Sequence, residues 1–292
     1  MDRIIDVYRF NHHSIEYSVT GDGQNPVLFL HGGHSNCHEV FGVEALVNQG
    51  LTVIIPSRPG YGHTSKEIGD SLAKACEYYI ELLNHLSIGK VHLITISAGG
   101  PSGIHLASKY PDRVRTLTLQ SAVTKEWLTS ENHLYKISHI IFRPPFEKMT
   151  WKLLSTFNTL FPKFTFRGML SSFSTLPYKD ILNRISDTDI EDIRKMNNRQ
   201  SSGSGFLIDL LQSNQITSQY LQDIMSPTLI IHSKYDASVP TDHAFYAQRN
   251  IPNSSLISSE SWGHIIWLGQ HAEEMNAKTT DFLKKHRNTE ME

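Results

Sequence analysis

Short apolar runs alternate with longer amphipathic stretches from Val27 onward, and this alternation predicts repeated strand–helix units around a parallel sheet. The runs expected to form its strands are 27–30, 52–55, 91–96, 114–119, 227–232 and 255–258. Two earlier segments, 4–10 and 14–20, predict an antiparallel pair at the start of the chain. The expected fold is therefore α/β, with a doubly wound, mostly parallel sheet of about eight strands.

Helical periodicity fills the stretches between these runs. Residues 70–86 place apolar side chains three and four positions apart, which predicts one apolar helix face, and Gly89 is expected to cap its end. A second helix is expected to begin just past Ser97 and to end before Pro111. A third is predicted over 271–285, with lysines at its C-terminal end where the helix dipole favours cations.

Residues 125–225 interrupt the strand–helix rhythm. They contain many aromatic residues and few β-branched runs, so we expect a helical cap inserted over one end of the sheet. The core would then comprise residues 1–124 and 226–292. The serine- and glycine-rich segment 201–205 is expected to be flexible and to act as a hinge. Four aromatic residues of the cap are candidates for substrate contact: Phe142, Trp151, Phe157 and Phe161.

The charge of this insertion is uneven. Residues 132–179 hold seven Lys or Arg and a single acidic residue, Glu147. The simpler interpretation is a solvated lid whose lysine stems lie along its surface. The alternative is an apolar pocket under a basic lid, suited to acyl or aromatic substrates that carry an anionic group.

Composition excludes several classes of protein. The 292 residues suffice for a sizeable core, and 27 basic against 29 acidic side chains leave a formal charge of −2, so nucleic acid is not an expected partner. No apolar run reaches the ~18 residues of a membrane span, and the first residues lack a signal peptide's apolar stretch. Two cysteines, expected to be reduced, form no disulfide framework. We therefore expect a cytoplasmic protein without stable membrane insertion, and its oligomeric state stays open.

The strongest chemical signal is a serine between a strand and a helix. The apolar run 91–96 leads directly into Ser97, and Gly99 and Gly100 follow. A strained strand-to-helix turn of this kind exposes a nucleophile and tolerates only small neighbours. The match is TxSxG, because Thr95 stands where GxSxG has its first glycine. The alternative is that Ser97 only caps the following helix.

A second motif follows the first parallel strand. Residues 27–30 lead into His31-Gly32-Gly33. Glycine lets the backbone approach a developing negative charge within hydrogen-bonding distance, so this loop is a candidate oxyanion site. The alternative is an ordinary glycine-rich turn after a strand.

Two further candidates follow the last two predicted strands. Asp236 comes shortly after residues 227–232, and we favour it over Asp242 because it lies nearer the strand end. His264 follows the last strand and a glycine, which distinguishes it from the other fifteen histidines. The chain order Ser97, Asp236, His264 allows His264 to take the serine proton while Asp236 stabilises the charged imidazole.

Taken together, these motifs resemble the α/β-hydrolase superfamily over nearly the whole chain. The resemblance rests on four features in order: His31-Gly32-Gly33, the segment 58–65, the Ser97 turn, and the pair Asp236 and His264. It implies that the Gly33 and Ala98 N–H groups form the oxyanion hole and that 125–225 is the substrate-covering cap. Ser57 departs from the pattern, because many relatives carry aspartate there, and we expect the change to affect loop anchoring more than chemistry.

Two further motifs are weaker. Gly60-Tyr61-Gly62 after a strand approaches a dinucleotide-binding fingerprint but lacks its third glycine. The histidines at 31, 34 and 38, with Cys37, suggest metal spacing, but no carboxylate cluster accompanies them in the sequence. Neither a cofactor nor a metal is expected.

The predicted function is a serine hydrolase that cleaves a small or medium carboxylic ester through a Ser97 acyl-enzyme. C–C bond hydrolases, lactonases, aminopeptidases and perhydrolases of the same fold share similar constellations and stay open as alternatives. A small-molecule receptor that retains the hydrolase pocket with little turnover is an alternative from another class. A small molecule is the expected partner in each case.

Overall fold

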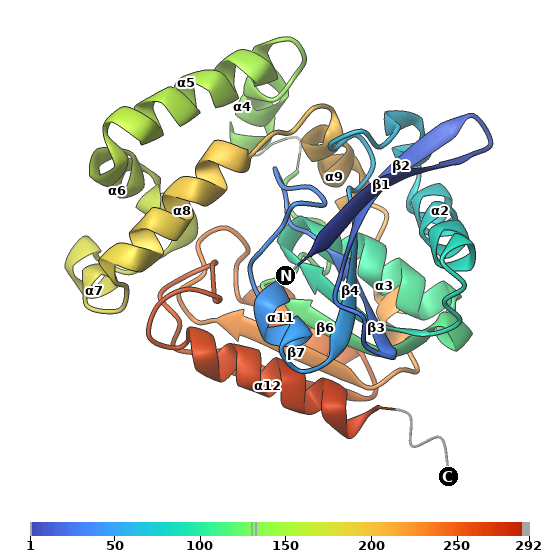
Figure 1. The fold of residues 1–292 in the computed structure, drawn as a ribbon. Coiled ribbons are helices and arrows are strands. Elements are labelled where there is room, and N and C mark those ends of the chain that lie inside the picture. The colour runs from blue at the N-terminus through green and yellow to red at the C-terminus, as the bar shows by residue number, and fades with distance from the viewer. Residues whose placement is uncertain (1, 130, 132, 288–292) are drawn as a thin grey trace.

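An eight-stranded sheet forms the centre of the computed structural model, which describes residues 2–129, 131 and 133–287 (Figure 1). Its strands are β1 (Arg3–Phe10), β2 (His13–Thr20), β3 (Asn25–Leu30), β4 (Leu51–Pro56), β5 (Val91–Ile96), β6 (Val114–Gln120), β7 (Thr228–Ser233) and β8 (Ser254–Ser259). They lie in the order β1-β2-β4-β3-β5-β6-β7-β8. The β1–β2 and β2–β4 pairs are antiparallel and the remaining pairs are parallel. The expected fold class is confirmed.

The sheet is buried on both faces because the central strands are apolar at successive positions. Along β3, Leu28 and Leu30 belong to one hydrophobic cluster, while Val27 and Phe29 belong to the other. Side chains alternate between faces along a strand, so one continuous apolar run supplies two cores. This explains why the parallel strands appear in the sequence as uninterrupted hydrophobic segments.

Helices cover both faces. The first core includes side chains of α2 (Leu72–His85), α3 (Gly100–Lys109) and α11 (Asp242–Asn250), and the second includes those of α1 (Val43–Val47) and α12 (Ala272–Lys285). Short 3₁₀ helices span Lys66–Gly69, Ser97–Gly99 and Pro111–Arg113. The sequence pattern thus predicted α2, α3 and α12, but not α1 or α11.

The expected C-cap of α2 is wrong. The left-handed residue after the helix is Ser87, with φ of 57°, and the following Ile88 N–H donates to the Leu83 carbonyl at 2.8 Å. This hydrogen bond satisfies an orphan carbonyl of the last turn, as a glycine at this position commonly does. Gly89 lies two residues further on and takes no part, because the chain has already left the helix there.

Seven helices of the described residues lie between β6 and β7. They are α4 (His133–Ile141), α5 (Phe146–Leu160), α6 (Pro162–Phe173), α7 (Tyr178–Leu182), α8 (Asp187–Arg199), α9 (Gly205–Ser213) and α10 (Ser218–Gln222). Figure 1 shows α4 to α8 as a layer set apart from α2 and α3. In contrast, α10 packs against α3 and α11, and its Leu221 belongs to the first core. The insertion therefore contains an outer layer of helices and a last part that joins the core.

The segment 201–205 is not a free hinge, so that expectation is wrong. Ser202 is buried, and Glu147 accepts hydrogen bonds from the N–H groups of Ser202 at 2.6 Å and Gly203 at 3.0 Å. Gly203 has φ of 51°, and a Cβ there would lie 2.5 Å from the Gly60 carbonyl oxygen. Serine and glycine are needed here for a tight, hydrogen-bonded turn rather than for mobility.

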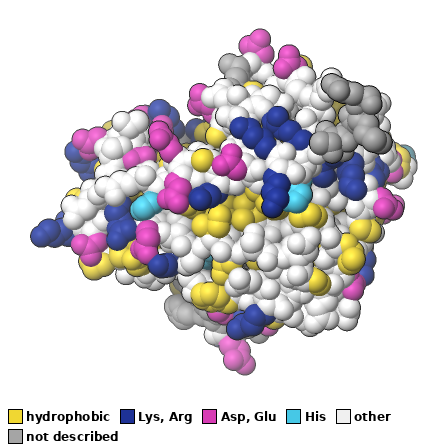
Figure 2. Space-filling view, turned by 90° about the horizontal axis from the view of Figure 1, so that it is seen from below, with side chains coloured by type: hydrophobic (Ala, Val, Ile, Leu, Met, Phe, Trp, Pro, Cys, Tyr) yellow, Lys and Arg dark blue, Asp and Glu magenta, His cyan; other side chains and the backbone are white. Residues whose placement is uncertain are grey.

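The surface carries both signs of charge. Figure 2 shows one face on which acidic and basic side chains intermingle around a strip of hydrophobic side chains. No helix within the described part of the chain combines the length and apolar character needed to cross a lipid bilayer.

Candidate active site

Ser97 stands at the turn between β5 and α3. Its φ is 50°, in the left-handed region that residues other than glycine rarely adopt. The turn packs closely on the end of β3, since a Cβ on Gly99 would lie 2.7 Å from the Leu30 carbonyl oxygen. The strained serine and the small neighbours expected from the sequence are therefore both present.

The structure brings Ser97, His264 and Asp236 together. The Ser97 Oγ lies 3.0 Å from His264 Nε2, and His264 Nδ1 lies 2.7 Å from Asp236 Oδ2. An Nδ1–H that donates to the carboxylate leaves Nε2 as an acceptor for the serine hydroxyl proton. The three residues follow β5, β8 and β7, whose C-terminal ends share one edge of the sheet.

Several groups hold Asp236 in its ionised form. Its Oδ1 accepts hydrogen bonds from the N–H groups of Ser238 at 2.8 Å and Val239 at 2.9 Å. Burial alone would raise the pKa of Asp236, but the His264 and His232 rings outweigh burial and lower this pKa to about 2. Asp236 is therefore a carboxylate at neutral pH.

His232 is a neighbour of the site that the sequence interpretation missed. Its Nε2–H donates to the Val239 carbonyl at 2.8 Å and lies 3.3 Å from Asp236 Oδ2. A polar residue near the end of the apolar strand β7 was the available signal. The rival Asp242 lies elsewhere, at the start of α11, where its exposed carboxylate pairs with Lys125.

The two expected oxyanion donors are neighbours. A Cβ placed on Gly33 would lie 3.9 Å from the Cβ of Ala98, and one on Gly32 would lie 3.3 Å from the Cβ of Ser97. The glycine loop therefore passes directly beside the serine turn. His31 fixes this loop, because its Nδ1 bonds the Gly32 carbonyl at 2.7 Å while its Nε2 accepts from the Arg58 N–H at 3.0 Å.

Arg58 connects the oxyanion loop, the serine turn and the insertion. Its guanidinium donates to the carbonyls of His31 at 2.8 Å and Ala98 at 3.2 Å, and forms a buried ion pair with Asp209 of α9. Tyr61 donates its hydroxyl proton to the same carboxylate at 2.6 Å. Burial would lower the pKa of Arg58, but Asp209 outweighs it and raises that pKa. A lone aspartate in the apolar α9 segment was the sequence signal for this contact.

The end of α6 is attached to the loops that carry His264 and Asp236. The Phe173 carbonyl accepts hydrogen bonds from the N–H groups of His264 at 2.8 Å and Ala237 at 3.3 Å. The next residue, Ser174, forms an isolated β-bridge with Asp236. Contacts with the insertion therefore position two of the three residues.

Ser97 and His264 open onto a cavity of about 620 Å³. Among the candidate aromatic residues, Phe142 and Trp151 line this cavity. Phe157 and Phe161 do not line it, because each is more than half exposed on the outer surface of the insertion. The expectation of substrate contact for these two is wrong: an aromatic helix position alone does not reveal which side it faces.

Comparison with known proteins identifies the family. The profile of the alpha/beta hydrolase fold matches residues 25–269. The chain belongs to this family. It is a hydrolase, and the uncharacterized hydrolase YcgS of Bacillus subtilis (strain 168) is similar to it, with 54% identity over 284 residues that cover 97% of this chain and 100% of that protein.

More distant proteins are also similar to this hydrolase, one in sequence and one in structure. A 2-hydroxy-6-oxononadienedioate/2-hydroxy-6-oxononatrienedioate hydrolase of Burkholderia vietnamiensis is 26% identical over 286 residues, 93% of this chain and 91% of that protein. The solved structure of an alpha/beta hydrolase fold protein from Nakamurella multipartita has a TM-score of 0.81 and 22% identity, and the match covers 96% of this chain and 99% of that one.

In this hydrolase, His34 forms part of the cavity wall beside Gly33. Its ring lies 4.2 Å from that of Phe206, 4.5 Å from Phe142 and 5.0 Å from Trp151 between centroids. The Ser202 Oγ lies 2.6 Å from His34 Nδ1 and accepts from Trp151 Nε1 at 2.9 Å. Burial, with a smaller contribution from Arg58, lowers the pKa of His34 to about 3, so the ring is neutral.

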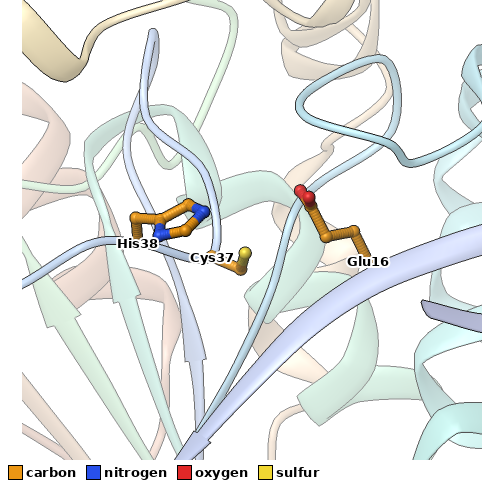
Figure 3. Close-up of side chains that lie close together, drawn as sticks. All are labelled: Glu16, Cys37 and His38. Atoms are coloured by element: carbon orange, nitrogen blue, oxygen red, sulfur yellow. The ribbon is translucent and has the colours of Figure 1, made fainter. Parts of the chain in front are cut away.

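Glu16, Cys37 and His38 form a second group of potential ligands behind the oxyanion loop (Figure 3). Their donor atoms lie within 4.8 Å of one another. Burial raises the pKa of the Cys37 thiol to about 11, which opposes the thiolate that a metal requires. Glu16 also accepts the Ser57 hydroxyl at 2.6 Å, and Ser57 Oγ accepts the Cys37 N–H at 2.9 Å. Glu16 and Ser57 thus anchor the loop around Cys37 through hydrogen bonds.

Proposed function

We propose that this protein is a serine hydrolase that cleaves small or medium carboxylic esters. The observation that carries the proposal is the hydrogen-bonded series Ser97–His264–Asp236 at the wall of a cavity. A serine hydroxyl is a weak nucleophile on its own, and an oriented imidazole supplies the base that it needs. The strained φ of Ser97 supports the same role.

Acylation would begin with attack of Ser97 Oγ on the ester carbonyl carbon, while His264 Nε2 accepts the hydroxyl proton. Asp236 stabilises the imidazolium that forms, and the N–H groups of Gly33 and Ala98 bind the oxyanion. The imidazolium then protonates the alkoxide oxygen as the C–O bond breaks, so an alcohol leaves. The acyl group remains on Ser97.

Deacylation would repeat these transfers with water in place of the hydroxyl. His264 accepts a proton from water, whose oxygen attacks the acyl carbon, and the imidazolium returns the proton to Ser97 as the acid departs. Asp236 is suited to its part because its lowered pKa keeps it charged at neutral pH.

The cavity supports the substrate class. A volume of about 620 Å³ lies within the range of small-molecule sites. Helices α5, α6 and α8 contribute the apolar side chains Leu154, Met169 and Met196 to its lining, although α8 also contributes Arg199. Residues 125–225 would therefore act as the cap that covers an acyl chain.

A fluorophosphonate probe tests the proposed nucleophile. The native protein should be labelled, and Ser97→Ala should lose the label. The control Ser171→Ala should retain it, because Ser171 lines the cavity but forms no hydrogen bond with a histidine of the described residues. A folded native protein that resists the probe would contradict the proposal. That result would favour a receptor that retains the pocket.

A C–C bond hydrolase is the second candidate, favoured by the 26% identical Burkholderia vietnamiensis protein whose name gives 2-hydroxy-6-oxononadienedioate as substrate. Rates measured on a panel of substrates distinguish the two candidate functions. Esters of increasing acyl length should show a clear optimum if the first proposal holds. Flat, very low ester rates with turnover of the dienedioate would replace it with the second.

A further inference from the structure

The outer face of α5 carries an exposed row of large hydrophobic side chains. They are Phe146 (55% exposed), Met149 (56%), Leu153 (54%), Phe157 (54%) and Leu160 (65%). Steps of three and four residues put them on one side of the helix. This side is separate from the inner side, where Trp151 is buried beside the cavity.

The row continues onto the neighbouring helices. Ile140 of α4 is 68% exposed, and Phe161 and Phe164, around the start of α6, are 55% and 76% exposed. The rings of Phe157 and Phe161 lie 6.4 Å apart. Among the described residues, sixteen large hydrophobic side chains are exposed, and eight of them fall between Ile140 and Phe164. A concentration of this kind marks an interaction surface rather than scattered exposure.

Packing within the insertion does not need this surface. The inner side of α5 already anchors the helix: Glu147 binds the N–H groups of Ser202 and Gly203, and Asn158 donates to the Arg194 carbonyl at 2.8 Å. These groups are buried, and they account for the attachment of α5 to the rest of the insertion. The outer hydrophobic row therefore needs an explanation beyond folding.

Basic side chains accompany the hydrophobic row. Lys136, Arg143, Lys148 and Lys152 are exposed, and the ion pairs of the described residues include none of them. The acidic residue of this stretch, Glu147, is buried and faces inward. The exposed surface of α4, α5 and the start of α6 thus joins large apolar groups to positive charge.

We propose that this surface, made by residues 136–164, docks on an anionic lipid membrane. The hydrophobic row would enter the boundary between headgroups and acyl chains, while the lysines and Arg143 would lie against lipid phosphates. Docking is peripheral and needs no spanning segment. A second copy of the chain fits the surface less well, because a two-fold contact through residues 136–164 sets its cations against each other and the acidic residue of that range, Glu147, is buried.

Vesicle co-sedimentation tests the docking without reference to catalysis. The protein should sediment with vesicles that contain phosphatidylcholine and phosphatidylglycerol, less with phosphatidylcholine alone, and less at high salt. The double variant Leu153→Ser/Phe157→Ser should weaken binding at least about tenfold, since it removes two apolar anchors. Lys148→Glu/Lys152→Glu should weaken binding to the anionic vesicles to a similar degree.

Matched controls separate docking from general surface effects. Ile4→Ser/Met225→Ser changes two exposed apolar residues elsewhere, and Lys66→Glu/Lys90→Glu changes two exposed lysines elsewhere. Both should bind like the native protein, and circular dichroism should show that all variants are folded. The proposal is overturned if the native protein sediments with neither vesicle, or if controls and test variants lose binding equally. It is also overturned if light scattering shows a dimer that Leu153→Ser/Phe157→Ser dissociates.

Discussion

The side chain of Thr95 fills the space that a side chain on Gly103 would occupy. A Cβ built on Gly103 would lie 2.1 Å from Thr95 Cγ2, although Gly103 belongs to α3 and Thr95 to β5. Thr95 takes the place of the first glycine in the GxSxG pattern. The glycine of α3 therefore compensates for the larger residue and lets the helix pack close to the strand below Ser97.

Gly103→Ala should destabilise the protein by about 1–3 kcal/mol, because the added methyl group overpacks this contact. Urea unfolding measures the effect. The double variant Thr95→Ala/Gly103→Ala should recover most of the loss, since it removes the overlapping methyl group. Gly168→Ala is the control: Gly168 is also helical, nothing lies within 4 Å of its Cβ position, and we expect no destabilisation.

The strands of the sheet and three residues of the candidate site could be predicted from the sequence, because local patterns specify them. Each strand of the sheet was predicted within one or two residues. For β3 to β7 the reason is that apolar runs of this length have few alternatives in a parallel sheet. The residues expected at the site also meet, because Ser97, Asp236 and His264 each follow a strand at the same sheet edge. Their catalytic role remains a prediction for the probe experiment.

The features that the sequence did not predict depend on tertiary contacts. Arg58 and Asp209 are 151 positions apart, and no local pattern pairs them. Phe157 and Trp151 lie on the same helix, yet one faces solvent and the other the cavity, and only packing decides this. The residue that caps α2 is Ser87 and not the expected Gly89, because a residue other than glycine can adopt a positive φ when hydrogen bonds stabilise it.

Asp236→Asn should lower kcat for esters by roughly 10³–10⁴-fold, because an amide neither stabilises the imidazolium nor holds the required tautomer of His264. Steady-state kinetics on the best ester of the panel measures this. Asp242→Asn is the matched control, six residues away with an exposed side chain, and should keep nearly native kcat. Equal loss in both variants would mean that Asp236 has been assigned the wrong role.

Leu154→Phe should shift the preferred ester to a shorter acyl chain, because Leu154 lines the cavity and a larger side chain removes volume from it. The neighbouring Leu153 provides a control, since it is 54% exposed on the outer face of α5. Leu153→Phe should leave the chain-length optimum unchanged. The measurement is kcat/KM as a function of acyl length. If the optimum shifts equally in both variants, the acyl group binds elsewhere.

Breaking the buried ion pair should be more harmful than removing it. Asp209→Ala leaves the Arg58 guanidinium buried without its partner, and we expect a loss of about 3–5 kcal/mol in the free energy of unfolding. Arg58→Met/Asp209→Leu should regain much of this stability, because two apolar side chains fill the space without a charge. Its activity should remain low, since Arg58 also binds the His31 and Ala98 carbonyls. If this double variant recovered both stability and activity, a positioning role for Arg58 would be excluded.

Stability should fall as the pH is lowered from neutral. Burial lowers the pKa of His34 to about 3, and those of His92 and His243 to about 4, whereas an unfolded histidine titrates near about 6.5. Between these values the unfolded chain binds protons that the folded protein does not, so the free energy of unfolding rises with pH across this window. His34→Gln should reduce that slope by up to about 1.4 kcal/mol per pH unit, the equivalent of one proton. Urea titrations from pH 4 to 7 measure the slope, and an unaltered slope for His34→Gln would show that His34 becomes charged in the folded state.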